Sequence, residues 1–359
     1  MDPGTGRKKL VYCTNVMSSF VRNDVELLRT RFDVSVFHFA VGRKISTPLL
    51  LLRQFFFLVT RLPRSAVSVT QFAGYHSLLP VLLGRLFRVP SLVVLGGTDC
   101  ARFPSIGYGD HTRRLLGWFS LRSIANATHL SPVDGSLVEC EYVYTRSEGD
   151  PPRQGYKGLF PWVDTPHTTL AYGYDDDRFR PQGGREPGTF LTVSRMSGPN
   201  IQRKGIDLFF AMALRFPQCK FTLLGDVPGM KYPPVPPNVT ILRTVPYEEL
   251  PAYYSRFTFY MQLSMWEGFP SAPCEAMLCG CVPIVSRVAA LPAIVGDAGF
   301  ILDHKDPEAL AILMGQALLA DTERMGEQAR NRIRTHYPQE TRKKLLHLIG
   351  SELMAPGNR

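Results

Sequence analysis

The chain has 359 residues, of which 45% are hydrophobic and 20% charged, and its formal net charge is +10. This length accommodates two domains with separate cores, and the composition is that of a globular protein. The sequence has no apolar run of 18 or more residues, no Cys-x2-Cys pair and no recognisable nucleic-acid-binding module. These absences argue against a transmembrane helix, a metal centre and a nucleic-acid partner.

The positive charge and the N-terminus bear on partners and location. An excess of Lys and Arg attracts nucleotide phosphates or an anionic lipid surface. The first residues, MDPGTGRKKL, lack the apolar core of a signal peptide, and the seven Cys are scattered. We therefore expect reduced thiols and a cytoplasmic protein, with a peripheral position at the inner face of a membrane as a further possibility.

The N-terminal half alternates predicted strands and helices. Strands are expected at 10–14, 34–39, 66–71 and 91–95, with helices at 24–31 and 76–87. This alternation predicts an α/β domain with a doubly wound parallel sheet, whose ligands lie beyond the carboxyl ends of the strands.

Two polar residues follow these strands closely. Asp99 comes after a Gly-Gly turn, where it would either orient a hydroxyl group of a substrate or cap the next turn. His76 begins an apolar helix and is equally compatible with a structural role. Asp134 is interpreted as a helix cap.

The run from Pro48 to Arg64, PLLLLRQFFFLVTRLPR, is apolar and carries three Arg. It follows Arg43 and Lys44, and it is too short and interrupted to span a bilayer. We interpret it either as a helix that faces the core of the first domain or as an amphipathic helix on anionic lipid, and the first reading is favoured.

The C-terminal half repeats the alternating pattern. Irregular segments are expected at 146–160 and at the proline-rich loop 227–238, and a basic helical run at 322–349 is interrupted near Tyr337-Pro338. The expected strands are 189–194, 219–224, 239–242, 256–263, 282–286 and 299–302, and the expected helices are 205–215, 247–254, 272–279 and 306–319.

The most informative segment is SMWEGFPSAPCEAMLCGCVPIV, residues 264–285. Glu267 and Glu275 bracket a loop and a predicted helix start at Ser271, between two predicted strands. The amide groups at the start of such a helix attract an anion, most simply a phosphate. Two Glu at this spacing are a weak signal alone, since one commonly caps the helix and the other is solvated.

The surroundings of this segment resemble the retaining glycosyltransferases of the GT-B fold, family 4 (glycosyl transferases group 1). That family has an E-x7-E motif of this form, an upstream Arg and Lys-Gly, and a Gly-Asp that ends a strand. This chain has Val193-Ser-Arg195, Lys204-Gly205, Gly225-Asp226 and the motif itself. The resemblance is specific over about residues 165 to 340 and looser before them.

The resemblance implies two Rossmann-like domains facing a cleft. The N-terminal acceptor-side domain would comprise residues 1–172, with a C-terminal helix at about 338–355 packing back on it. The nucleotide-sugar-binding domain would comprise residues 173–337.

It also implies site roles. Glu267 would contact the donor sugar, whereas Asp99 and His76 are catalytic candidates only from their positions after predicted strands. The interval between Arg195 and Lys204 is longer than usual in the family, so Arg203 would share or replace a role of Arg195. The implied donor-binding residues are Arg195, Lys204, Asp226, Val245 near the base, Gly268, Phe269, Pro270, Ser271 and, on the ribose, Glu275.

The implied function is transfer of a sugar, with retention, from a nucleotide-diphosphate sugar to a glycan or lipid-linked acceptor. The resemblance suggests surface polysaccharide or glycoconjugate synthesis, with no metal and no cofactor. The alternatives are a nucleotide-sugar epimerase of the same fold and a non-catalytic nucleotide-sugar-binding protein. A phosphorylase would require a much longer chain.

Overall fold

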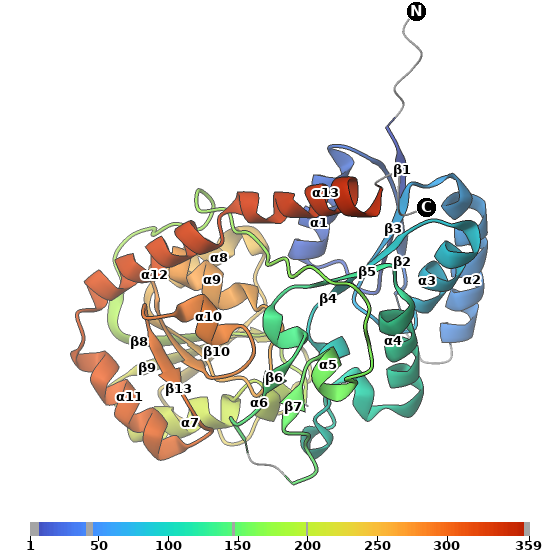
Figure 1. Ribbon diagram of the computed structural model, residues 1–359. Coiled ribbons are helices and arrows are strands. Elements are labelled where there is room, and N and C mark those ends of the chain that lie inside the picture. Colours follow the sequence, from blue (N-terminus) through green and yellow to red (C-terminus); the bar gives the residue numbers. More distant parts are fainter. Residues whose placement is uncertain (1–6, 41–45, 146–147, 199, 355–359) are drawn as a thin grey trace, which may run out of the picture. The chain divides into compact units, whose positions relative to one another are not determined.

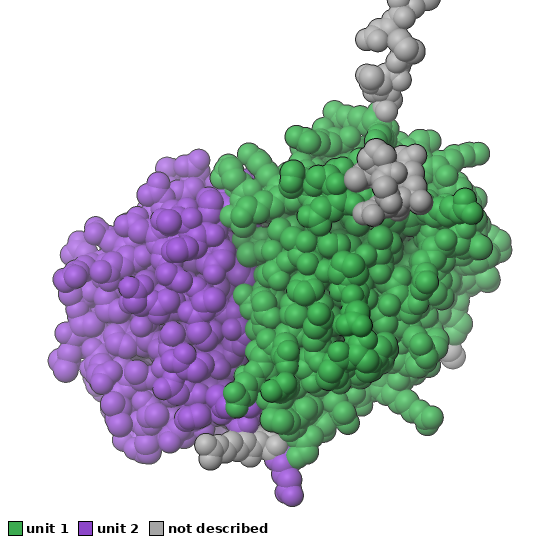
Figure 2. Space-filling model, in the orientation of Figure 1, with its two compact units in different colours: residues 1–141, 149–172, 340–359 green, residues 142–148, 173–339 purple. Residues whose placement is uncertain are grey.

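The computed structural model describes residues 7–40, 46–145, 148–198 and 200–354, and the chain divides into two compact units (Figures 1 and 2). The first unit comprises residues 1–141, 149–172 and 340–359, and the second comprises residues 142–148 and 173–339. Residues 142–148 thus group with the second unit, whereas the sequence analysis had assigned them to the N-terminal domain.

The first unit is built on a parallel five-stranded sheet in the order β2-β1-β3-β4-β5. Adjacent strands pair in parallel, and β1 lies between β2 and β3. A small antiparallel hairpin, β6 Cys140–Glu141 with β7 Arg153–Gln154, follows the sheet. The sheet strands are β1 Lys9–Thr14, β2 Asp33–His38, β3 Val67–Gln71, β4 Ser91–Leu95 and β5 His129–Pro132.

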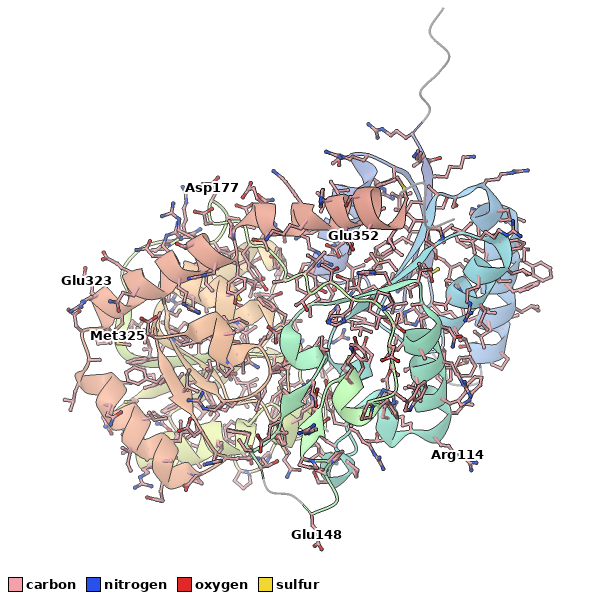
Figure 3. All side chains as sticks on the ribbon, viewed as in Figure 1. Arg114, Glu148, Asp177, Glu323, Met325 and Glu352 are labelled. Carbon is pink, nitrogen blue, oxygen red and sulfur yellow. The ribbon has the colours of Figure 1, made fainter. Side chains whose placement is uncertain are left out.

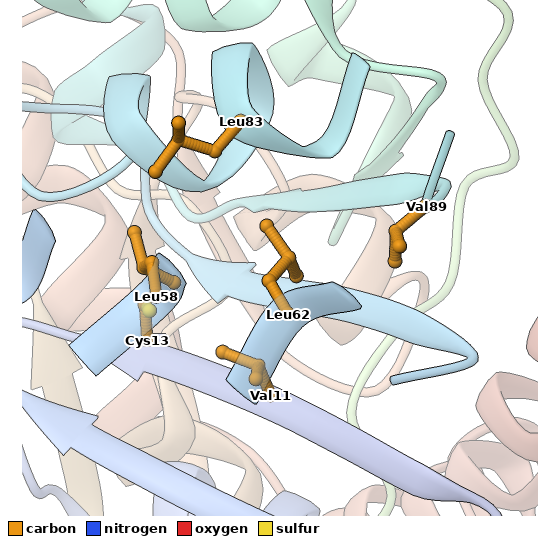
Figure 4. Packing of buried hydrophobic residues seen from close by; sticks show 6 residues of the cluster. All are labelled: Val11, Cys13, Leu58, Leu62, Leu83 and Val89. Atoms are coloured by element: carbon orange, nitrogen blue, oxygen red, sulfur yellow. The ribbon is translucent and has the colours of Figure 1, made fainter. Parts of the chain in front are cut away.

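Helices cover both faces of this sheet. The chain passes from β1 to β2 in one direction across the sheet and then from β2 to β3, β4 and β5 in the opposite direction. Because crossovers between parallel strands are right-handed, α1 lies on one face of the sheet and α2, α3 and α4 lie on the other. A buried apolar cluster lies between β1 and the C-terminal parts of α2 and α3 (Figure 4). It is formed by Val11, Cys13, Leu58, Leu62, Leu83 and Val89. The helices are α1 Ser19–Arg29, α2 Thr47–Arg61, α3 Leu78–Phe87, α4 Arg114–Asn126 and the short α5 Tyr156–Leu159.

The second unit contains a parallel six-stranded sheet in the order β10-β9-β8-β11-β12-β13. Its centre is held by three stacked rings, with Phe190 4.9 Å from Phe221 and 4.8 Å from Phe259 between ring centroids. The strands are β8 Glu186–Val193, β9 Lys220–Asp226, β10 Val239–Arg243, β11 Phe257–Gln262, β12 Val282–Ser286 and β13 Phe300–Leu302.

The helices of the second unit follow the strands in turn. The longest, α12, ends before Tyr337, where the sequence predicted an interruption. The α-helices are α6 Asn200–Arg203, α7 Ile206–Arg215, α8 Leu250–Ser255, α9 Ser271–Leu278, α10 Leu291–Val295, α11 Pro307–Leu319 and α12 Thr322–His336.

The C-terminal residues return to the first unit from Glu340 onward. Arg342 makes a two-pronged ion pair with Asp24 of α1, through Nε at 2.7 Å and Nη2 at 2.6 Å, and its Nη1 donates to the carbonyl of Leu170. Both side chains are buried. This pair ties the last helical stretch, α13 Lys344–His347 with η9 Leu348–Leu353, to the first unit.

Most predicted elements are confirmed to within a few residues, and three predictions need correction. The segment 114–132, for which no element was predicted, forms α4 and β5. The loop predicted at 146–160 contains β7 and α5. Helix α1 begins at Ser19, five residues before the predicted start. Arg43 and Lys44 lie outside the described residues.

No helix in the described part of the chain is long and apolar enough to cross a membrane.

Candidate functional site

The Lys-Gly pair brings helix α7 close to the end of strand β11. Gly205 precedes α7 with φ at +68°, and a Cβ atom there would lie 2.1 Å from the carbonyl oxygen of Leu263. Only glycine fits a backbone of this conformation at so close an approach. The amide of Met265 donates to the carbonyl of Arg203 at 2.8 Å, which fixes the two segments together. Lys204 is thereby placed beside the E-x7-E segment.

Lys204 and Glu267 form an ion pair in which the side chains are only 15% and 10% exposed. The Nζ of Lys204, the Nε2 of Gln262 at 3.0 Å and the Oγ of Ser264 at 2.6 Å all donate to Oε1 of Glu267. Burial alone would raise the pKa of Glu267, but the charges of Lys204 and Arg203 hold it below its ordinary value. Glu267 is therefore an ionised carboxylate in a fixed orientation.

The long interval between Arg195 and Lys204 contains the single turn α6. Arg195 is exposed after β8, and its carbonyl accepts a hydrogen bond from Asn200 at 2.9 Å. Arg203 contacts Asn200 through Nε at 3.0 Å and the carbonyl of Trp266 through Nη1 at 3.4 Å. Arg203 thus shares the surroundings of the Lys204–Glu267 pair, whereas Arg195 extends to the surface.

Glu275 lies on α9 and is buried between two tyrosines. The hydroxyl of Tyr247 donates to Oε1 and that of Tyr254 to Oε2, each at 3.2 Å. Burial raises the pKa of Glu275 to about 7, although both tyrosine hydrogen bonds and Arg178 act in the opposite sense. This carboxyl therefore changes its ionisation near neutral pH.

The start of α9 has the features of an anion site. Its N-cap is Pro270, which supplies no side-chain cap, so the first amides are not satisfied by a capping group. Ser271 accepts a hydrogen bond from Tyr174 at 3.3 Å, and the ring of Tyr174 stacks on Phe269 at 6.3 Å. Residues 268–271 are thus held by packing, with Gly268 between Glu267 and Phe269.

Asp226 ends strand β9, and Val245 comes after the neighbouring strand β10. A Cβ atom at Gly225 would lie 2.1 Å from the carbonyl oxygen of Ser194, so the close approach of the segment after β8 explains the glycine of the Gly-Asp pair. Asp226 accepts a hydrogen bond from Tyr232 at 2.8 Å. Val245 is half-buried after β10. Their expected roles toward the donor stay predictions.

Asp99 and His76 lie in the first unit, where both line a pocket of about 760 Å³. The carboxylate of Asp99 accepts hydrogen bonds from the amides of Ala73, Gly96 and Gly97 at 2.8–3.3 Å, so it fastens the loops after β3 and β4. His76 is buried against the carbonyl of Gln71 at 2.8 Å, and burial lowers its pKa to about 4. These contacts favour structural roles for both residues.

The same pocket contains a residue that the sequence analysis missed. Asp110 is held by Ser120 at 2.7 Å, and burial raises its pKa to about 7. Asp110 lies in a 3-10 turn well beyond the end of β4, so it does not come directly after a predicted strand. No local sequence pattern marked it. Asp134, in contrast, caps a short turn through Ser136 at 2.9 Å, which confirms its interpretation as a cap.

Comparison with known structures identifies the fold. The chain is similar to sucrose-phosphate synthase of Thermosynechococcus elongatus, with a TM-score of 0.71 at 16% identity over 95% of this chain and 98% of that one. It is also similar to the Anabaena protein HepE in complex with UDP and glucose, with a TM-score of 0.67 at 13% identity over 95% and 98%. These similarities, at low identity, concern the fold, which is confirmed as GT-B.

Comparison of sequences finds a matching family model within the second unit and a relative over a short segment. Residues 187–320 match the family model for glycosyl transferases group 1. A segment of 84 residues, 23% of this chain, is 37% identical to O-antigen chain mannosyltransferase B of Escherichia coli and covers 22% of that protein. The expected resemblance to group 1 glycosyltransferases is thus confirmed for the segment that contains Lys204, Glu267 and Glu275.

The raised pKa of Glu275 predicts pH-dependent behaviour. The unfolded carboxyl ionises near its ordinary value and the folded one near pH 7, so the native state binds more protons between these values, and stability should fall as pH rises from about 4.5 to about 7. If the ionised form holds the ribose hydroxyls, the affinity for a nucleotide sugar should instead rise, by about tenfold, from pH 6 to pH 8. Calorimetric titration at both pH values measures this effect. Glu275→Gln should remove it, and an equal slope in this variant would contradict the assignment.

Proposed function

We propose that this chain is a retaining glycosyltransferase that moves a sugar from a nucleotide-diphosphate sugar to a glycan or lipid-linked acceptor. One observation carries the proposal. The uncapped start of α9 lies in the same short segment as an ionised Glu267 paired with Lys204, and a second carboxyl, Glu275, is buried on the same helix. This arrangement offers cations and amides to a diphosphate and carboxylates to hydroxyl groups.

The donor would be held as follows. Lys204 has three N–H donors, of which Glu267 takes one, so the ion pair can persist while the ammonium contacts the diphosphate. Arg203 and the first amides of α9 add positive potential where charge builds on the leaving diphosphate. Glu267 would accept hydrogen bonds from the sugar and Glu275 from the ribose. UDP is the nucleotide to test first, since HepE is described with UDP and glucose, and mannose is a second sugar to test because of the mannosyltransferase.

Retention would follow from front-face substitution. The bond between the anomeric carbon and the phosphate oxygen breaks, the acceptor oxygen bonds to the same face of that carbon, and the leaving phosphate oxygen takes the acceptor proton. This step needs no protein nucleophile. The protein contributes a fixed electrostatic environment, a held sugar and exclusion of water.

The acceptor would enter the pocket of the first unit. Its lining is largely apolar and aromatic, and its polar residues include Asn15, Thr47, His76, Thr98, Asp99, Asp110 and Arg113. Asp110, with its pKa near 7, is the group best suited to exchange a hydrogen bond with an acceptor hydroxyl. Synthesis of a surface polysaccharide or glycoconjugate in the cytoplasm, with contact to the membrane, is the setting that we propose.

Two other functions share part of this evidence. A nucleotide-sugar epimerase of the same fold would release an altered sugar without an acceptor. A non-catalytic binding protein would hold the donor and leave it intact. We favour transfer over both, because an epimerase is expected to lack the combination of Lys204-Gly205 with Glu267 and Glu275, and intact ionisable residues argue against a non-catalytic protein.

A transfer assay with the two glutamate variants tests the proposal. Glu267→Gln should mainly lower kcat, because Glu267 faces the sugar as charge develops at the anomeric carbon. Glu275→Gln should mainly raise KM, because a ribose contact is made equally in the ground and transition states. Glu308→Gln serves as the control, since Glu308 forms an exposed ion pair with Arg215.

The same assay gives two outcomes that would count against the proposal. Release of epimerised sugar, or binding with no turnover of any donor, would favour one of the alternatives.

Activity should persist in EDTA, because cationic side chains and helix amides serve the diphosphate. Loss of activity in EDTA that Mn²⁺ restores would contradict the proposal that sugar transfer needs no metal ion.

A further inference from the structure

Helices α2, α3 and α4 form a layer on one face of the first unit's sheet. Helix α2 packs against α3, and α3 against α4, as Figure 1 shows. The inner side of α2 contributes Gln54 and Leu58 to the interior. The core-facing interpretation of this helix is therefore right for its inner side only.

The outer side of this layer is apolar along all three helices. On α2 the exposed residues Leu49, Leu52 and Phe56 follow helical spacing, and Leu52 and Phe56 are 53% and 58% exposed. Single exposed apolar residues are ordinary on a protein surface, but a set spread over three adjacent helices is not. We call this surface the outer face of α2–α4, and its exposed large apolar residues are Leu49, Leu52, Phe55, Phe56, Leu82, Leu86, Leu115 and Trp118.

The same helices have Arg but no acidic residue. The chain contains 31 Asp and Glu, yet none occurs between Asp33 and Asp99 or between Asp110 and Asp134. Arg114, at the start of α4, projects away from the unit in Figure 3. Arg122 lies over the ring of Trp118 at 5.8 Å. The exposed Arg of the three helices are Arg53, Arg61, Arg85, Arg114 and Arg122.

We propose that the outer face of α2–α4 docks on an anionic lipid bilayer. Apolar side chains at helical spacing enter the boundary between headgroups and acyl chains, while Arg side chains bind lipid phosphates. Two copies of this chain would pair poorly through this face, because the Arg side chains of one copy would meet those of the other with no carboxylate between them. The charge therefore selects an anionic partner, and the aromatic and aliphatic residues select one with an apolar interior.

The pocket of the first unit begins at the edge of this face. Leu115 belongs to the face and also lines the pocket, and Pro48 and Leu51 at the start of α2 line the pocket beside it. An acceptor with an apolar chain would pass from the bilayer into the pocket along these residues. This part of the inference rests on the proposed function, whereas docking itself does not.

Vesicle co-sedimentation of the full chain tests the docking. We expect binding to vesicles of three parts phosphatidylcholine and one part phosphatidylglycerol and weaker binding to phosphatidylcholine alone. In 0.5 M salt, binding to the anionic vesicles should fall to the level measured with phosphatidylcholine. Arg53→Gln, Arg85→Gln and Arg114→Gln together should lower the partition coefficient by about 100-fold, since each basic residue near the surface contributes about fivefold. Leu52→Ser with Phe56→Ser should abolish binding to phosphatidylcholine and weaken binding to the anionic vesicles.

Matched controls come from the second unit. Leu214 and Ile312 are 66% and 64% exposed, and Arg180, Arg256 and Arg324 are exposed on the same unit. Changing the two apolar residues to Ser, or the three Arg to Gln, should leave vesicle binding as in the wild type. Equal and negligible binding of the wild type to both vesicles, or an equal loss in the control variants, would overturn docking. So would a concentration-dependent dimer that only the Leu52 and Phe56 changes abolish.

Donor turnover separates this proposal from the proposed function. None of the five altered residues of the face lines the pocket or belongs to the donor site, so hydrolysis of a donor should be unchanged in the face variants. If the protein binds vesicles but turns over no donor, the proposed function is contradicted and the proposal of membrane docking stands.

Discussion

Lys204→Ala should reduce kcat/KM for sugar transfer by about 100- to 1,000-fold. Under the proposed function the change removes a charge that faces the leaving diphosphate, and loss of one such electrostatic contact commonly costs about 2.7–4 kcal/mol in the transition state. It also leaves Glu267 buried without its cation, so the pKa of Glu267 should rise. Steady-state kinetics of the purified variant with a fixed nucleotide sugar measures the loss.

The control is Lys220→Ala, because Lys220 forms an exposed ion pair with Glu186. It should leave kcat/KM within twofold of the wild type. Thermal denaturation of Lys204→Ala and of the double variant Lys204→Ala/Glu267→Gln separates lost catalysis from lost stability, since the second change removes the unpaired charge. A folded Lys204→Ala protein with wild-type kinetics would remove Lys204 from the site.

The second large effect is expected on stability. Asp24→Ala should destabilise the first unit by about 3–5 kcal/mol, since it leaves the guanidinium of Arg342 buried without its partner. Burial alone would lower the pKa of Arg342, and Asp24 more than offsets this, so the side chain stays charged in the fold. Hydrogen exchange of α1 and residues 340–353 in rising urea measures the loss locally, as a chain of two units need not unfold in one step.

A double variant makes this prediction specific. Asp24→Ala combined with Arg342→Met should recover much of the lost stability, because an apolar pair avoids the burial of an isolated charge. Glu139→Ala, which breaks an exposed ion pair with Arg153, should cost less than about 1 kcal/mol. If the double variant were as unstable as Asp24→Ala, the destabilisation would not arise from the unpaired guanidinium.

The sequence alone determined the alternation of strands and helices in both halves and the strand–loop–helix–strand unit around Glu267 and Glu275. Such features are local, because residue periodicity, caps and glycines record the conformation of their own segment. Lys204-Gly205, in contrast, was recognised through the family resemblance. The structure adds the reason for the glycine, which is the carbonyl of Leu263 within 2.1 Å of where a Cβ would lie.

Contacts between residues far apart in the chain were decided only by the tertiary structure. Burial raises the pKa of Glu275, while hydrogen bonds from Tyr247 and Tyr254, 28 and 21 residues earlier, act in the opposite sense, and neither effect leaves a mark on the local pattern. Asp99 accepts hydrogen bonds from three backbone amides, which favours a structural role that the local pattern left open.

The run 48–64 shows the same division within one helix. Its apolar composition predicts a helix but not which side is covered, because burial depends on what packs against it. The sheet and α3 cover the side of Leu58, while Leu52 and Phe56 stay exposed. The sequence thus determined the elements and the family resemblance, and the packing of distant segments determined ionisation, burial and the surface left open to a partner.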